Sequence, residues 1–119
     1  MYREVRDAAR RLDEADQYLR AALLGGDTRL IGSEATRAQA VIVEVLDRLN
    51  SSVQDSQEHD VNPQFAQAAI AELNLAWVNA EKVGLGTSPE DMKGFVLDIK
   101  TNVDFARAYL RASLGDEEV

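Results

Sequence analysis

Ser88-Pro89-Glu90-Asp91 is the stretch that decides the fold class, because it carries the side-chain chemistry of a helix start. A serine before a proline at the first helical position can cap the free N–H groups, and Asp91 can close a capping box back onto Ser88. Asn62-Pro63 repeats the combination of cap and proline earlier in the chain. Around these breaks, apolar residues recur at three- and four-residue spacing, with no run of strict alternation. The pattern predicts an all-α protein, an antiparallel four-helix bundle.

Length and composition are those of one globular domain. The chain has 119 residues, 45% of them hydrophobic, which is enough to build a core without disulfides or metal ions. We expect a single helical-bundle domain over residues 1–115 and an acidic tail over 116–119. Cysteine is absent, so disulfides and thiolate chemistry are excluded. With no apolar signal segment and no stretch of membrane-spanning length, a cytoplasmic protein with no membrane partner is expected.

The charge balance disfavours nucleic acid as a partner. The formal net charge is −8, which opposes any binding that depends on neutralising phosphates. Arginines do gather in the first predicted helix, but four acidic residues are interleaved with them: Asp7, Asp13, Glu14 and Asp16. The spacing predicts a solvated face with i,i+4 ion pairs such as Asp16–Arg20, in which the carboxylates are exposed. The clustered arginines are Arg3, Arg6, Arg10 and Arg11.

The breaks and the apolar periodicity predict the helix boundaries. The first helix is expected from about residue 3 to 24, with Gly25-Gly26 ending it through left-handed backbone. Residues 25–33 are expected to form a loop, with Ser33 as the N-cap of the second helix. The third helix is expected to begin at Pro63 and to bury Trp77, and the fourth to run from residue 89 to near 115.

The later helices carry more apolar residues than one bundle interior needs. The third and fourth predicted helices each have a second apolar row opposite the first, and the second helix is apolar almost without pause over residues 40–46. A helix that is apolar on both sides is buried on both sides, by its own bundle or by a partner. Gly94 lies in such a row, and a mid-helix glycine costs about 1 kcal/mol, which close backbone approach can justify. The hypothesis places a partner-binding surface at Gln39, Val43, Leu75, Val78, Gly94, Leu97, Phe105 and Ala108.

No residue pattern predicts catalysis. His59 is the sole histidine and lies in a polar loop, so it cannot complete a transition-metal site. The glycine-rich run before Ser88 could suggest phosphate binding, but Glu90 and Asp91 already meet the helix dipole there. The sequence therefore predicts a protein that is not an enzyme, with no catalytic residue, no cofactor and no metal site.

Several short motifs lie along the predicted helices and their turns. They are Gly26-Asp27, Arg37-Ala38-Gln39, Leu49-Asn50-Ser51-Ser52, Trp77-Val78-Asn79-Ala80-Glu81, Gly94-Phe95-Val96 and Phe105-Ala106-Arg107-Ala108-Tyr109. Together they resemble motifs of the flagellin-specific export chaperones, over about residues 12–110. The resemblance implies a helical bundle that holds an aggregation-prone helical segment, such as one of flagellin, until export.

Two functional hypotheses remain at this stage. The first is a cytoplasmic chaperone or adaptor that sequesters an amphipathic segment of another protein. The alternative is a homodimeric regulatory or inhibitory bundle, in which the second apolar rows pair between two copies and the acidic surface meets a basic target. A carboxylate enzyme with a bound metal is a third class, which nothing in the sequence favours.

Overall fold

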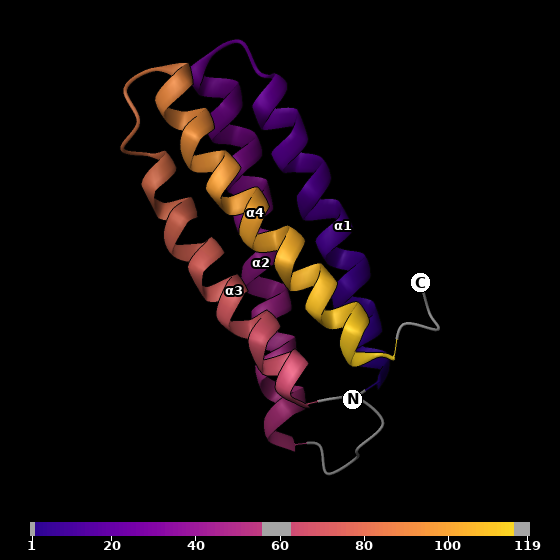
Figure 1. Cartoon of the computed structure of the whole chain (residues 1–119). Coiled ribbons are helices and arrows are strands. Elements are labelled where there is room, and N and C mark those ends of the chain that lie inside the picture. Colours follow the sequence, from indigo (N-terminus) through magenta and orange to yellow (C-terminus); the bar gives the residue numbers. More distant parts are fainter. Residues whose placement is uncertain (1, 56–62, 116–119) are drawn as a thin grey trace.

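The chain folds into four α-helices that run alternately up and down (Figure 1). The computed structural model describes residues 2–55 and 63–115. Within these ranges every regular element is a helix, and the helices are α1 (Tyr2–Leu24), α2 (Thr28–Asp55), α3 (Pro63–Val83) and α4 (Pro89–Ser113). The predicted all-α antiparallel four-helix bundle is confirmed.

Each helix packs against two neighbours. α1 contacts α2 and α4, and α3 contacts α2 and α4, so α1 and α4 close the bundle side by side. α2 and α4 also touch across the diagonal, and the Cα trace measures 46 × 25 × 16 Å. The bundle is therefore flattened, and its outer faces are large relative to its interior.

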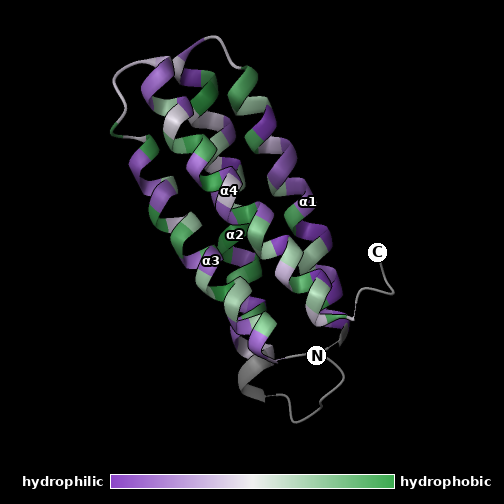
Figure 2. Ribbon diagram, in the orientation of Figure 1, coloured by the Kyte–Doolittle hydropathy of each residue, from purple (hydrophilic) through white to green (hydrophobic). Residues whose placement is uncertain are grey.

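The core is a continuous layer of aliphatic side chains contributed by all four helices. Hydrophobic and hydrophilic residues alternate around each helix, as the ribbon of Figure 2 shows. The inward side of α3 is built largely from small residues, because alanine occupies four of its buried positions. The largest fully buried side chains include Leu12, Leu19, Ile31, Ile42, Leu49, Leu73, Ile99 and Leu110.

The start of α4 matches the sequence prediction in its cap but not in its capping box. Ser88 is the N-cap, and its Oγ accepts a hydrogen bond from the Asp91 backbone N–H at 3.2 Å. The Asp91 carboxylate, however, accepts from the Thr87 hydroxyl at 3.1 Å. One side chain of the pair therefore caps the helix, and the other orders the loop before it.

The start of α2 corrects the sequence prediction. α2 begins at Thr28, and Ser33 lies inside it. Asp27 is the capping residue, because its Oδ1 accepts from the Leu30 N–H at 2.8 Å and its carbonyl from the Ile31 N–H at 3.1 Å. The earlier start adds a turn that buries Ile31 completely, and burial of a large aliphatic side chain contributes roughly 1.5–3 kcal/mol.

Gly25, the first of the two glycines after α1, acts through packing rather than through left-handed backbone, whereas a Cβ on Gly26 would have open space. Among the described residues, glycine has a positive φ at Gly115 (90°) and not at Gly25 or Gly26, so that part of the prediction is wrong. A Cβ on Gly25 would lie 3.0 Å from Ile31 Cγ1, so the residue must be small for α2 to approach. Gly86 is tighter, since a Cβ there would lie 2.6 Å from Met92 Cγ.

Candidate functional site

Large apolar side chains lie on the outward sides of α3 and α4. Leu75, Leu97 and Phe105 are each 53% exposed, and Val78 is 47% exposed. Ala108 on α4 is exposed as well. The exposure on which the partner-surface hypothesis depends is therefore present at these positions. We call the set Leu75, Val78, Leu97, Phe105 and Ala108 the outer apolar face.

Polar contacts between α3 and α4 set the register of this face. Asn102 Nδ2 donates to Glu72 Oε1 at 3.0 Å and accepts from Asn79 Nδ2 at 2.8 Å through its own Oδ1. Leu75 lies between these two α3 residues, and Phe105 lies one turn beyond Asn102. The register therefore places both apolar residues beside the same α3–α4 boundary. Eight residues of helix rotation turn Leu97 about 80° from Phe105, so it faces further from α3.

The boundary continues at the lower end of the two helices as an aromatic pair. The rings of Phe65 and Tyr109 are stacked, with their centroids 6.3 Å apart and an interplanar angle of 23°. Phe65 comes from the first turn of α3 and Tyr109 from the last turns of α4. Offset stacking adds about 0.5–1.5 kcal/mol to the burial of such rings. The ring pair therefore helps to hold α3 against α4 at this end of the outer apolar face.

Gly94 is exposed and not crowded by the rest of the described chain. Apart from its chain neighbours and the nearby backbone of its own helix, no described atom lies within 4 Å of the position that a Cβ would occupy on it. Close approach of another segment of this chain therefore does not explain the glycine. Gly94 therefore exposes its backbone to solvent on the same helix that carries Leu97 and Phe105.

Gln39, Val43 and Trp77 belong to a different surface, the flank between α2 and α3. Gln39 Nε2 donates to Glu81 Oε1 at 3.4 Å. One turn further along these antiparallel helices the same register places Val43 opposite Trp77, and these residues are 38% and 41% exposed. The predicted burial of Trp77 is wrong, because the alanine-rich inner side of α3 packs close to its neighbours and leaves no room for an indole.

A charged seam joins α1 to α4, and it corrects the prediction that Asp16 is exposed. Asp16 is only 4% exposed. Its carboxylate lies 2.8 Å from Arg20 Nε and 3.1 Å from Lys100 Nζ. The contact with Lys100 is an ion pair without hydrogen-bond alignment, since Asp16 Oδ1 has no hydrogen-bond partner among the described residues. The hydrogen bond to Asp104, together with the negative charge of Asp16, raises the pKa of Lys100, so this ammonium stays charged.

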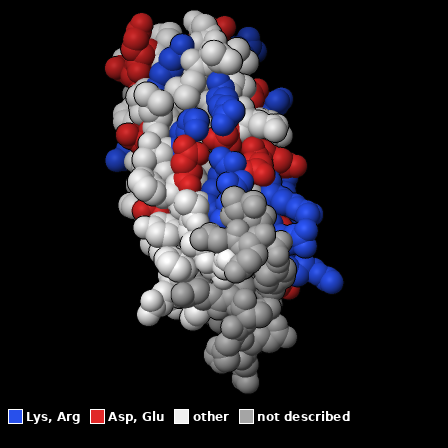
Figure 3. Space-filling model, turned by 45° about the vertical axis from the view of Figure 1, so that its right-hand side comes forward, with Lys and Arg blue, Asp and Glu red and all other residues white. Residues whose placement is uncertain are grey.

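The seam extends toward the end of α4 through further ion pairs. Arg107 Nη2 lies 2.6 Å from Asp13 Oδ1, and Arg107 Nη1 lies 3.7 Å from Asp16 Oδ2. Figure 3 shows the resulting band of alternating blue and red side chains, beside a surface that is mostly uncharged. The sequence held one signal for the buried carboxylate, because Asp16 follows Leu12 by four residues and directly follows the core residue Ala15.

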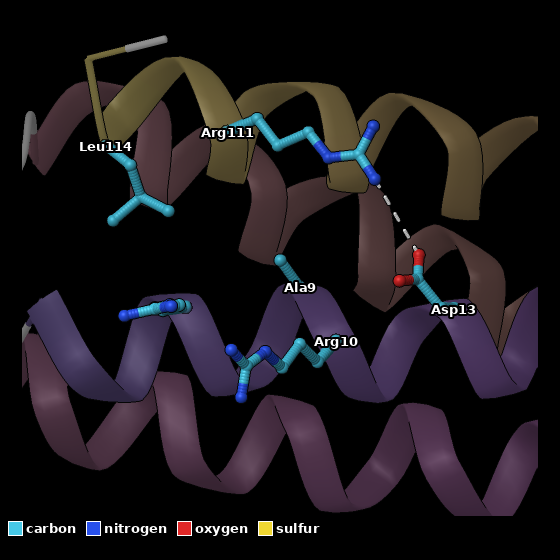
Figure 4. Close-up of a pocket in the computed structure, with 6 residues that line it drawn as sticks. Ala9, Arg10, Asp13, Arg111 and Leu114 are labelled. Carbon is cyan, nitrogen blue, oxygen red and sulfur yellow. Dashed lines mark ion pairs between the residues drawn. The ribbon is translucent and has the colours of Figure 1, made fainter. Parts of the chain in front are cut away.

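A hollow of about 180 Å³ lies at the end of the seam, between α1 and the last turn of α4 (Figure 4). Ala9 projects into it from α1, and Leu114, the residue directly after α4, projects into it from the other side. Arg111 Nη2 lies 3.8 Å from Asp13 Oδ1 along one edge. The remaining lining residues are Arg6 and Arg10.

The described residues show no arrangement typical of a metal centre. They contain no group of three His, Cys, Asp or Glu side chains placed to hold a metal ion. His59 and Asn62 lie outside the described residues. Within the described ranges, none of the helices is both long enough and apolar enough to cross a bilayer.

Comparison with protein-family models, with curated proteins and with solved structures finds no match.

Proposed function

We propose that this chain is a non-enzymatic protein-binding bundle whose outer apolar face holds an amphipathic helical segment of a partner protein. The observation that carries the proposal is the half-exposure of Leu75, Leu97 and Phe105 on adjoining sides of α3 and α4. Scattered exposed leucines are ordinary, but a set concentrated on two neighbouring helices is typical of an interaction site.

The shape of this face favours a helix as the occupant. The antiparallel α3 and α4 lie side by side (Figure 1), and a third helix can rest along the boundary between them. A partner helix would supply apolar residues at three- and four-residue spacing, which is the helix-in-groove mode of recognition. Asp98 is exposed on α4 near the face, and so basic residues along the margin of the partner helix would be favoured.

The resemblance to flagellin-specific export chaperones supports a particular partner. A chaperone of that kind would act in the cytoplasm and keep a helical segment of flagellin from aggregating. The outer apolar face suits such a segment, and the bundle core does not depend on the exposed residues that would contact it. Flagellin is therefore the first ligand to test.

The test is a calorimetric titration of the full chain with purified flagellin, repeated with Phe105→Glu and Leu97→Glu. We expect binding by the wild type and a loss on the order of a hundredfold in each variant, because a carboxylate would be buried against apolar side chains. Gln17→Glu is the matched control, since it adds the same charge at an exposed position on α1. If Phe105→Glu and Leu97→Glu bind flagellin as tightly as the control and the wild type, the outer apolar face does not contact it.

Light scattering on the same proteins tests the alternative, a homodimeric regulatory or inhibitory bundle. A wild-type dimer that Phe105→Glu and Leu97→Glu convert to monomer, without flagellin binding, would replace the chaperone proposal by self-association. A wild-type monomer that binds flagellin would support the chaperone proposal.

A further inference from the structure

The first three turns of α1 carry an arginine stripe, Arg3, Arg6 and Arg10, that the protein-binding proposal does not use. Spacings of three and four residues place these side chains on one side of the helix. Within the described part of the chain none of them forms an ion pair, whereas the adjacent Arg11 pairs with Glu14 and Glu44. In a chain with net charge −8, this is a local concentration of positive charge, which Glu4 beside Arg3 and Asp7 beside Arg6 offset only in part.

The position of the stripe on α1 strengthens the positive potential. The N-terminal end of a helix carries roughly half a positive charge from its aligned peptide dipoles, so acidic residues are favoured there and basic residues are disfavoured. Arg3 and Arg6 lie in the first two turns of α1, where they oppose this preference. The stability of α1 therefore gives no reason for arginines at these positions.

The stripe borders two hollows. Arg6 and Arg10 line the hollow of about 180 Å³ beside Leu114, and Arg111 reaches the same hollow from α4 (Figure 4). A wider, shallower hollow of about 400 Å³ is lined by Arg3, Arg6, Asp7 and Arg10. Among the described residues, Asp13 is the one carboxylate that lines the first hollow, and its Oδ1 already lies 2.6 Å from Arg107 Nη2 and 3.8 Å from Arg111 Nη2. Arg6 and Arg10 are thus left to meet an incoming negative group.

From these observations we propose that the hollow between α1 and the end of α4 binds a single compact oxyanion, a carboxylate or a phosphate, through Arg6, Arg10 and Arg111. Guanidinium groups match the planar geometry of such anions and can bind them bidentately. The volume lies below the roughly 300–1,000 Å³ of pockets that enclose drug-sized ligands, and so one anionic group fits rather than a large molecule. Ala9 and Leu114 supply an apolar wall that excludes water from one side of the anion.

Two sources can supply that chemistry. One is a free oxyanion, for which inorganic phosphate is the probe. The other is the chain itself, because Asp116, Glu117 and Glu118 follow Leu114 closely in the sequence. The site does not depend on the outer apolar face, so it can fail or succeed independently of the proposed chaperone function.

The test is a phosphate titration of the full chain, followed by NMR through the arginine Nε–H signals. We expect saturable shifts at Arg6, Arg10 and Arg111, and a loss of affinity on the order of tenfold in Arg10→Gln, which corresponds to one hydrogen bond with a charged group. Arg29→Gln is the matched control, because it removes one positive charge from an exposed arginine on α2 that forms no ion pair within the described residues. Its affinity should change less than twofold.

A triple variant that replaces these three carboxylates by uncharged amides, Asp116→Asn/Glu117→Gln/Glu118→Gln, separates the two sources. If the chain's own carboxylates occupy the hollow, this variant shifts the Arg6 and Arg10 signals without phosphate and binds phosphate more tightly than the wild type. If the ligand is a free anion, neither changes. The proposal is overturned if phosphate moves Arg29 as strongly as Arg10, or if neither phosphate nor the neutral variant perturbs the three pocket arginines.

Discussion

The two flanks of α4 differ in which kind of side chain they carry: charged side chains toward α1, and apolar side chains left exposed on the outward side. Toward α1, α4 presents Lys100 and Arg107 to the buried Asp16, so charge lies where a bundle usually places aliphatic residues. On its outward side it exposes Leu97 and Phe105, so apolar surface lies where charge is usual. A buried ion pair contributes little net stability, but removing one partner costs roughly 3–5 kcal/mol because it leaves a buried charge uncompensated. α4 therefore meets α1 through paired charges, while its outward side leaves apolar side chains in solvent.

The largest effect should separate the inner and outer sides of α3. Leu73 is fully buried and Leu75 is 53% exposed, so Leu73→Ala should lower the free energy of unfolding by roughly 2–5 kcal/mol. The same change at Leu75 removes the same atoms but opens no cavity, and we expect a loss below about 1 kcal/mol. Chemical denaturation monitored by circular dichroism measures both. Equal losses would place Leu75 in the core and abolish the outer apolar face.

A somewhat smaller effect should come from breaking the charged seam. Asp16→Asn leaves Lys100 and Arg107 without their shared carboxylate, and we expect a loss of about 2–3 kcal/mol, below the roughly 3–5 kcal/mol of fully buried pairs because both cations reach solvent. Asp98→Asn, at an exposed position on α4, should change stability by less than about 0.5 kcal/mol. Urea unfolding of the two variants measures whether the seam stabilises the fold. An unchanged free energy of unfolding in Asp16→Asn would show that it does not.

Helix caps should contribute next, since they determine where the helices that carry both flanks begin. Ser88→Ala and Asp27→Ala should each cost about 1 kcal/mol, because each leaves a helix N–H without its acceptor. Ser33→Ala is the control: Ser33 lies inside α2, where alanine is the better helix former, and so thermal unfolding should shift little or upward. A destabilised Ser33→Ala would restore the later start of α2 that the sequence predicts.

The smallest effect should distinguish an exposed ion pair from the buried seam. Arg11 donates to Glu44 across α1 and α2, at 3.0 Å from its Nε, and this hydrogen bond lowers the pKa of Glu44 below its ordinary value of 4.5. A lowered folded-state pKa gives stability that is present above the unfolded value and is lost as pH falls through the folded value. Between pH 7 and pH 3 the free energy of unfolding should therefore fall less in Glu44→Gln than in the wild type.

Replacing the other partner provides the check on this pH dependence. Arg11→Gln should reduce the same pH dependence, while Arg29→Gln, which removes an equal charge elsewhere, should leave it unchanged. Identical pH profiles for the wild type and Glu44→Gln would show that the Arg11–Glu44 contact adds nothing in solution.

Local chemistry determined the class of fold and two of its helix starts. The Ser88 cap and the proline-led starts of α3 and α4 involve neighbouring residues, and three- and four-residue periodicity is a property of a single helix. The exposure of Leu75, Leu97 and Phe105 was also predictable, because a second apolar row cannot face the same interior as the first. None of these features depends on which helices are neighbours in the bundle.

The tertiary structure decided what depends on neighbouring helices. Trp77 and Leu73 belong to one apolar pattern, yet only Leu73 is buried, because the spacing between α2 and α3 is set by alanines on α3. Asp16 is buried because Lys100 and Arg107, more than eighty residues later in the chain, approach it from α4. Periodicity gives the direction of a side chain around its own helix. The distance and charge of the helix it meets arise only when the four pack together, and those decide whether the side chain is buried, paired or left for a ligand.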